Sequence, residues 1–119
     1  MAKILIIEDN PNNMKLAQLV LETSGHQVLQ AGNALDGLDI ARTHLPELVL
    51  MDIQLPGMDG LTATQLLKED AKTSHIKVVA LTAFAMKGDE EKMRKAGCDG
   101  YIAKPIRYKE FLATVDALL

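Results

Sequence analysis

Short apolar runs alternate with stretches of helical periodicity along the whole chain, and this alternation restricts the fold more than any other feature. The runs are rich in isoleucine, valine and leucine and lie at residues 3–8, 27–31, 47–52, 76–82 and 100–104. The first, third and fourth runs are continuously apolar, which is typical of strands buried on both faces of a parallel sheet. Five strand–helix units in succession predict an α/β fold, a doubly wound five-stranded parallel sheet between two layers of helices.

The stretches after the first two runs carry signals that start helices. Asn10 followed by Pro11 is a good helix start, because an asparagine side chain caps free amide groups and proline has no amide to satisfy. Asn33 is the next candidate cap. Apolar side chains then follow at helical spacing and are expected to face inward, at Ala34, Leu38, Ala41 and Leu45.

Three more helices are expected, at about residues 60–71, 86–96 and 108–119. The helix at 86–96 is the weakest of the five predicted helices, since it offers little to bury beyond Met86, Met93 and Ala96. An element with few buried contacts shifts more easily than a well-packed one. This helix is therefore a candidate for a moving part.

Length and composition exclude several classes of protein. The chain has 119 residues, of which 48% are hydrophobic and 24% charged, so we expect a single globular domain over residues 1–119. A net charge of −3 gives no positive field for nucleic acid, and the lack of tryptophan leaves no stacking platform. The longest apolar runs have four residues, whereas a membrane span needs about 20. We therefore expect neither direct nucleic-acid binding nor membrane insertion.

The cysteine and the histidines give no sign of a metal or disulfide framework. Cys98 is the single cysteine and cannot form an internal disulfide, which together with the lack of a signal-peptide pattern predicts a cytoplasmic protein. We expect Cys98 to be a small loop or core residue. His26, His44 and His75 show no ligand spacing and are expected on the surface.

Polar side chains stand at the ends of four of the five apolar runs. The first run ends in Glu8-Asp9, the third in Asp52, the fourth in Thr82 and the fifth in Lys104. With the flavodoxin-like strand order 2-1-3-4-5, these ends meet at the edge where open parallel sheets bind ligands. Lys104 would then start roughly 10 Å from Asp52, a gap that its flexible stem can largely span. Three carboxylates, a hydroxyl and an ammonium at one edge suit a divalent cation such as Mg²⁺ and a phosphate.

Each of these residues also has an ordinary structural interpretation. Asp9 can serve the start of a helix, and Asp52 can simply end a strand. Thr82 is of a type common within strands, and a lysine before a proline is most often a solvated loop residue. Their occurrence at corresponding strand ends makes a shared site the better interpretation.

Four segments together resemble a known family. Residues 8–10 read Glu-Asp-Asn, 51–60 read Met-Asp-Ile-Gln-Leu-Pro-Gly-Met-Asp-Gly, 82–83 read Thr-Ala and 104–105 read Lys-Pro. This set resembles the receiver domain of bacterial two-component response regulators, the CheY-like family, in register from the first strand to the last helix. The segment that begins Thr-Ala-Phe-Ala-Met-Lys-Gly-Asp at Thr82 is similar in particular to DivK-type single-domain regulators.

The resemblance implies a phosphoryl-accepting site. Asp52 matches the residue that takes a phosphoryl group from the phosphohistidine of a sensor histidine kinase or a histidine phosphotransfer protein. Asp9 matches a direct Mg²⁺ ligand, the backbone carbonyl of Gln54 matches another, and Glu8 matches a carboxylate that acts mostly through water. Many receivers carry aspartate where this chain has Glu8, which puts the water network in doubt. Thr82 completes the match as the hydroxyl that contacts the phosphoryl oxygens.

The resemblance also implies a switch and an output surface. Lys104 matches the ammonium that contacts the phosphoryl oxygens, and its bond to Pro105 is expected to be cis. Tyr101 matches an aromatic residue that turns inward when the threonine moves. Gln54 and Phe84 match positions that tune dephosphorylation. Output is expected through protein contacts on the surface of the fourth helix, fifth strand and fifth helix.

Two other functions fit this sequence less well. A phosphatase of the haloacid dehalogenase type wants a second aspartate two residues after the nucleophile, where Gln54 stands. In a flavodoxin, Glu8 and Asp9 would repel the flavin phosphate. Two alternatives stay open: a receiver that binds proteins without phosphorylation, and a receiver cut from a hybrid histidine kinase or a longer regulator.

Overall fold

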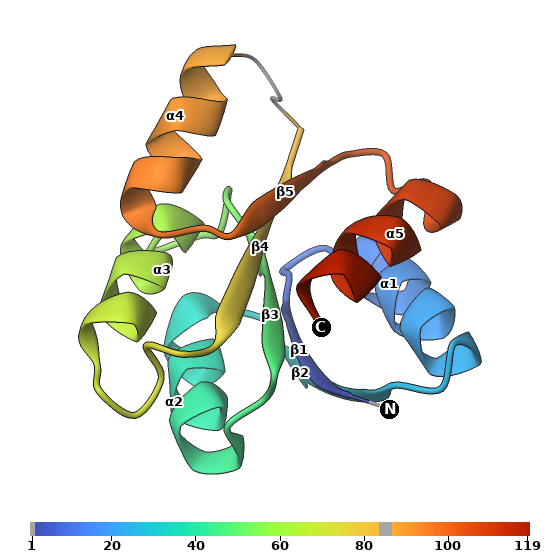
Figure 1. Ribbon diagram of the computed structural model, residues 1–119, viewed down its shortest axis with the longest axis horizontal. Helices are drawn as coiled ribbons and strands as arrows, with labels where there is room; N and C mark the ends of the chain where they lie inside the picture. The colour runs from blue at the N-terminus through green and yellow to red at the C-terminus, as the bar shows by residue number, and fades with distance from the viewer. Residues whose placement is uncertain (1, 84–86) are drawn as a thin grey trace.

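The computed structural model describes residues 2–83 and 87–119, in which strands and helices alternate (Figure 1). The strands are β1 (Lys3–Ile7), β2 (Gln27–Ala31), β3 (Leu48–Asp52), β4 (Lys77–Thr82) and β5 (Gly100–Ala103). The helices are α1 (Pro11–Thr23), α2 (Ala34–His44), α3 (Gly60–Glu69), α4 (Lys87–Ala96) and α5 (Tyr108–Leu118). The predicted succession of five strand–helix units is confirmed.

The sheet has the order β2-β1-β3-β4-β5, and all of its pairs are parallel, as predicted. Helices α1 and α5 cover one face, and α2, α3 and α4 lie on the other (Figure 1). The fold is therefore a doubly wound three-layer sandwich.

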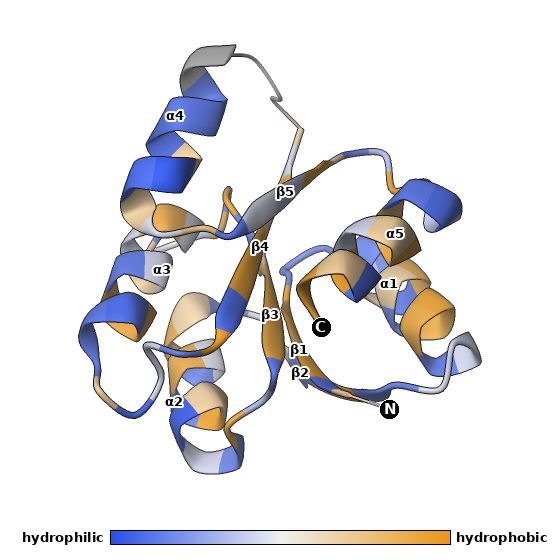
Figure 2. Cartoon of the chain, viewed as in Figure 1, coloured by the Kyte–Doolittle hydropathy of each residue, from blue (hydrophilic) through white to orange (hydrophobic). Residues whose placement is uncertain are grey.

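Strand β3 shows why the apolar runs do not alternate with polar residues. All five of its residues are buried, because helices cover both faces of the sheet. Val49 and Met51 pack in the core cluster under α2 and α3, whereas Leu48 and Leu50 pack in the cluster under α1 and α5. Figure 2 shows β3 mostly in orange, the colour of hydrophobic residues. The chain becomes polar only at Asp52, where the strand leaves the core.

Both predicted asparagine caps are present. The side-chain oxygen of Asn10 accepts hydrogen bonds from the amides of Asn12 and Asn13 at the start of α1. That of Asn33 accepts from the amide of Asp36 at the start of α2. Each cap satisfies amides that have no partner within the helix. The caps also determine where the chain turns after β1 and β2.

Two expectations about side-chain burial are wrong. Leu45 does not continue the inward face of α2: it caps that helix in the left-handed conformation, with φ of 47°, and is 48% exposed. The helix cannot continue there because Pro46 follows. The His26 side chain is only 10% exposed, whereas His44 and His75 are on the surface as expected. The ring of His26 is buried because its Nδ1 accepts a hydrogen bond from the amide of Ala2.

Two helices have different ends from those predicted. Helix α3 stops at Glu69, and Asp70 turns the chain by accepting a hydrogen bond from the amide of Lys72. Helix α4 begins at Lys87, and Met86 lies outside the described residues. Within residues 2–83 and 87–119, the helices are too short or too polar to cross a membrane.

Candidate functional site

The polar residues at the carboxyl ends of four strands lie together at one edge of the sheet. Glu8 and Asp9 follow β1, Asp52 ends β3, Thr82 ends β4, and Lys104 follows β5. Strand β3 lies between β1 and β4, so the residues of those strands flank Asp52 as the strand order predicted. Carboxylate oxygens of Glu8, Asp9 and Asp52 all lie within 4.8 Å of one another.

The side chain of Lys104 crosses from the edge of the sheet to its centre. Its Nζ lies 3.2 Å from Oδ2 of Asp52 and 2.9 Å from Oε1 of Glu8. The long stem therefore spans the distance of two strands, and one ammonium faces two carboxylates. The bond between Lys104 and Pro105 is cis, as expected.

The three carboxylates differ in their exposure to solvent. Glu8 and Asp52 are buried, whereas Asp9 is exposed. A buried charge needs a partner, which Lys104 provides to both buried groups. Asp9 extends the negative charge of the cluster to the surface, where an ion from solvent can reach it.

Backbone amides hold the two buried carboxylates in place. The amide of Gln54 donates to Oδ1 of Asp52 over 2.9 Å, and the amide of Asn10 donates to Oε2 of Glu8 over 3.3 Å. Oε1 of Glu8 is buried and accepts no hydrogen bond within the described part of the chain, although the Lys104 ammonium stands beside it as a counter-ion. A buried oxygen with a free lone pair is a place for a water molecule or a cation.

The surroundings shift the pKa values of the two buried acids, Glu8 and Asp52, in opposite directions. Burial, together with the neighbouring Asp52, raises the pKa of Glu8 from 4.5 to about 7. Burial also acts to raise the pKa of Asp52, but hydrogen bonds with Glu8 and the Gln54 amide and the charge of Lys104 outweigh it and lower that pKa. The pKa of Lys104 is raised, because its carboxylate partners outweigh its own burial. Asp52 is thus the buried acid that stays ionised.

Gly60 allows α3 to begin directly against the end of β3. A β-carbon at this position would overlap the backbone carbonyl oxygen of Asp52. The amide of Gly60 also donates to the carbonyl oxygen of Ile53 over 3.1 Å. The absence of a side chain at Gly60 therefore lets the loop fold back tightly and keeps Asp52 at the edge of the sheet.

Thr82 and Tyr101 occupy different places relative to this cluster. Thr82 is buried at the end of β4, and its carbonyl accepts a hydrogen bond from the Lys104 amide over 2.7 Å. A cavity of about 70 Å³ lies beside Thr82 and Gln54. Tyr101 is not in the cluster: its ring is exposed on β5, and its hydroxyl donates to Glu90. Phe84 lies outside the described residues.

Sequence reasoning missed two parts of this arrangement. It did not pair Glu8 with Lys104, because the two residues are far apart in sequence and no local pattern links them. It also gave Gly60 no role beyond the start of a helix, although the stretch from Asp52 to Gly60 carried the most specific motif. Cys98 is half-buried, as expected of a small core or loop residue, and burial raises the pKa of its thiol.

Comparison with known proteins shows the family of this chain. The response regulator receiver domain family matches residues 4–116. The polar-differentiation response regulator DivK of Brucella anthropi is 50% identical over 116 residues, which cover 98% of this chain and 94% of that protein.

Solved structures of similar proteins have the same fold. The receiver domain of a sensor histidine kinase from Pseudomonas aeruginosa is 30% identical and superposes with a TM-score of 0.91, covering 98% of this chain and 96% of that one. That domain holds a magnesium ion in its active-site cleft. The chemotaxis protein CheY4 of Vibrio cholerae has a TM-score of 0.95 at 20% identity, covering 100% of this chain and 99% of its own, a likeness of fold alone.

Proposed function

Because the chain belongs to the response regulator receiver domain family of two-component systems and is DivK-like, we propose that it is a phosphorylation switch whose acceptor is Asp52. The phosphoryl donor is the phosphohistidine of a sensor histidine kinase or a histidine phosphotransfer protein. The observation that carries this proposal is the pairing of Asp52 with Lys104, 3.2 Å apart, inside a cluster of three carboxylates.

The transfer step needs an ionised acceptor. An oxygen of the Asp52 carboxylate attacks phosphorus, and the bond between phosphorus and the donor imidazole nitrogen breaks. The imidazole nitrogen keeps the electron pair and takes up a proton, and Asp52 becomes an acyl phosphate. The lowered pKa of Asp52 keeps its carboxylate ready for this attack at neutral pH.

The neighbours of Asp52 position it and balance charge, which are the main demands of phosphoryl transfer. The Gln54 amide holds one carboxylate oxygen. Lys104 places its ammonium beside the other carboxylate oxygen and can move to an oxygen of the phosphoryl group. The Thr82 hydroxyl, one strand away, is the expected hydrogen-bond donor to the same group. These three residues and Asp52 form the proposed reaction site.

The donor set fits Mg²⁺. Hard oxygen ligands are what this ion prefers, and the chain offers the carboxylates of Glu8, Asp9 and Asp52 with the backbone carbonyl of Gln54. The buried Glu8 oxygen without a hydrogen bond supports the assignment, as does the magnesium ion in the related receiver of Pseudomonas aeruginosa. When bound, Mg²⁺ supplies positive charge that offsets the repulsion between Asp52 and an incoming phosphoryl group.

Output is proposed to pass through the surface of α4, β5 and α5 to a downstream protein. Among the described side chains of α4, Met93 and Ala96 are buried, so few buried contacts hold this helix in place. Hydrogen exchange with and without beryllofluoride, a phosphoryl mimic, tests this assignment. We expect protection to change across residues 87–101, and unchanged protection there would argue against this surface.

Intact mass after incubation with acetyl phosphate and Mg²⁺ tests the proposed function. We expect the wild-type chain to gain one phosphoryl group, which is lost on hydroxylamine treatment because an acyl phosphate is labile. Asp52→Asn should gain none. Asp39→Asn, an exposed aspartate on α2, is the matched control and should label like the wild type. No gain in the wild type would favour a receiver that binds proteins without phosphorylation.

A further inference from the structure

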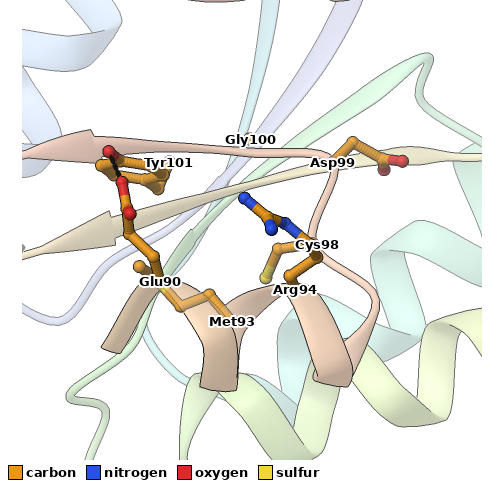
Figure 3. Close-up of a pocket in the computed structure, with 7 residues that line it drawn as sticks. All are labelled: Glu90, Met93, Arg94, Cys98, Asp99, Gly100 and Tyr101. Carbon is orange, nitrogen blue, oxygen red and sulfur yellow. Dashed lines mark hydrogen bonds between the residues drawn. The ribbon is translucent and has the colours of Figure 1, made fainter. Parts of the chain in front are cut away.

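Helix α4 lies between two hollows. Figure 3 shows the first, of about 160 Å³, between α4 and β5, with Glu90 and Tyr101 at its rim. The second, of about 70 Å³, lies on the side of Thr82. Met93 lines both hollows and is the large buried side chain among the described residues of α4. Because tight packing is missing on two sides, specific polar contacts have more influence on where α4 lies.

The carboxyl end of α4 is firmly tied to its neighbours. Nζ of Lys68, on α3, donates to Oδ2 of Asp99 over 2.9 Å and to the carbonyl of Ile76 over 2.8 Å. The amide of Val78, in β4, donates to the same Asp99 oxygen over 2.8 Å. The connection from α4 to β5 is therefore held by both α3 and β4.

Nearer the amino end of α4, a hydrogen bond between two side chains joins the described residues of this helix to β5. The Tyr101 hydroxyl donates to Oε1 of Glu90, as the dashed line in Figure 3 shows. Tyr101 is 39% exposed. Turning an exposed aromatic ring inward removes apolar surface from water and is favourable by itself. An interaction that keeps the ring outside therefore opposes that tendency, and the bond to Glu90 is such an interaction.

We propose that Glu90 is a positioning residue that holds Tyr101 outward and so biases the unphosphorylated protein toward its resting state. This inference rests on the proposed function and on the inward turn of Tyr101 upon phosphorylation that the resemblance to receiver domains implies. A contact made only in the resting state stabilises that state by some factor. The apparent affinity of the protein for the activating group then falls by up to the same factor. Glu90 thereby raises the concentration of the activating group that is needed to switch half of the protein.

The orientation of Tyr101 can be measured without phosphorylation. The chain has two tyrosines, so Tyr108→Phe leaves Tyr101 as the sole tyrosine signal in an NMR spectrum of tyrosine-labelled protein. A soluble gadolinium chelate attenuates resonances of exposed rings. We expect Glu90→Ala to lower the attenuation of the Tyr101 ring, because loss of one hydrogen bond shifts the equilibrium about fivefold.

Two variants separate this role from a general loss of structure. Glu91→Ala removes the same charge from an exposed neighbour on α4 and should leave the Tyr101 signal unchanged. Glu90→Gln keeps an acceptor oxygen and should restore most of the attenuation. Titration with beryllofluoride in the presence of Mg²⁺ gives the second measurement. We expect half-saturation of Glu90→Ala at an up to fivefold lower concentration than in the wild type.

The two measurements cover both possible resting equilibria. If the Tyr101 ring is almost always outward in the wild type, Glu90→Ala changes its attenuation little but lowers the half-saturating beryllofluoride concentration by the full fivefold. If the inward and outward orientations are about equally populated, Glu90→Ala changes the attenuation visibly. If Glu90→Ala matches Glu91→Ala in both measurements, the proposal is overturned. If Glu90→Ala turns the ring inward but beryllofluoride does not move Tyr101 in any variant, Glu90 retains its positioning role, the proposed bias toward the resting state is overturned, and the proposed phosphorylation of Asp52 is unaffected.

Discussion

Lys104 and Glu8 form an ion pair of 2.9 Å that joins the loop after β5 to the end of β1, across the two strands between them. The same ammonium faces Asp52, so one cation serves two buried carboxylates. The exposed Asp9 adds a third carboxylate to the cluster. Three carboxylates against one ammonium leave two excess negative charges at this edge of the sheet. A proton offsets one of them and a divalent cation offsets both, and this excess underlies the first two predictions.

Removing the Lys104 ammonium should slow phosphorylation strongly. In Lys104→Met the stem is kept, but Asp52 and an incoming phosphoryl group lose the cation that offsets their repulsion. We expect acetyl phosphate labelling, followed by intact mass, to slow on the order of a hundredfold. Lys72→Met, which removes an exposed lysine, is the control. Labelling of Lys104→Met at the wild-type rate would remove Lys104 from the proposed reaction site.

Glu8 should make the metal-free protein less stable as the pH rises from about 4.5 to about 7. Its pKa is raised in the folded state, so the native protein binds more protons than the unfolded chain in this window, and the free energy of unfolding falls with increasing pH. Asp52, with a lowered pKa, acts in the opposite sense but only at more acidic pH.

Urea unfolding in EDTA at several pH values measures this effect. Glu8→Gln should flatten the pH dependence of the unfolding free energy between pH 4.5 and 7. Glu22→Gln, at an exposed position on α1, should keep the wild-type slope. Equal slopes for Glu8→Gln and the wild type would show that Glu8 does not take up the proton.

A β-carbon at Gly60 should disturb both the fold and the site. Gly60→Ala would place that atom against the Asp52 carbonyl, and relief requires a backbone shift. Overpacking of this kind costs about 1–3 kcal/mol of unfolding free energy. Gly32→Ala is the matched control, because nothing lies within 4 Å of the added atom. Equal urea midpoints for the two variants would contradict the close approach of α3 to β3.

The tie between Lys68 and Asp99 should contribute measurably to stability. A double-mutant cycle of Lys68→Met and Asp99→Asn is expected to give a coupling free energy of about 1 kcal/mol, because the pair is partly buried and its atoms are 2.9 Å apart. The more exposed pair of Arg42 and Asp70, 3.2 Å apart, provides the comparison and should couple more weakly. A larger coupling free energy for the Arg42–Asp70 pair would mean that the Lys68–Asp99 contact does not hold the end of α4 in place.

Most of the fold followed from local patterns in the sequence. Continuous apolar runs such as residues 48–51 favoured strands buried on both faces. The caps at Asn10 and Asn33 depend on neighbours two or three residues away. Leu45 and His26 were misplaced for two different reasons. The burial of His26 depends on Ala2, which is distant in sequence, and the end of α2 depends on Pro46 more than on helical spacing.

The sequence by itself determined which residues stand at the carboxyl ends of the strands, because strand ends follow from apolar runs, and these runs are local. Only the tertiary structure decided that Lys104 faces both Glu8 and Asp52, that Asp52 is the acid kept ionised, and that Tyr101 meets Glu90. Those relationships depend on distances between segments far apart in the chain. Such distances are set by how the helices pack on the sheet, and they cannot be predicted from local sequence patterns.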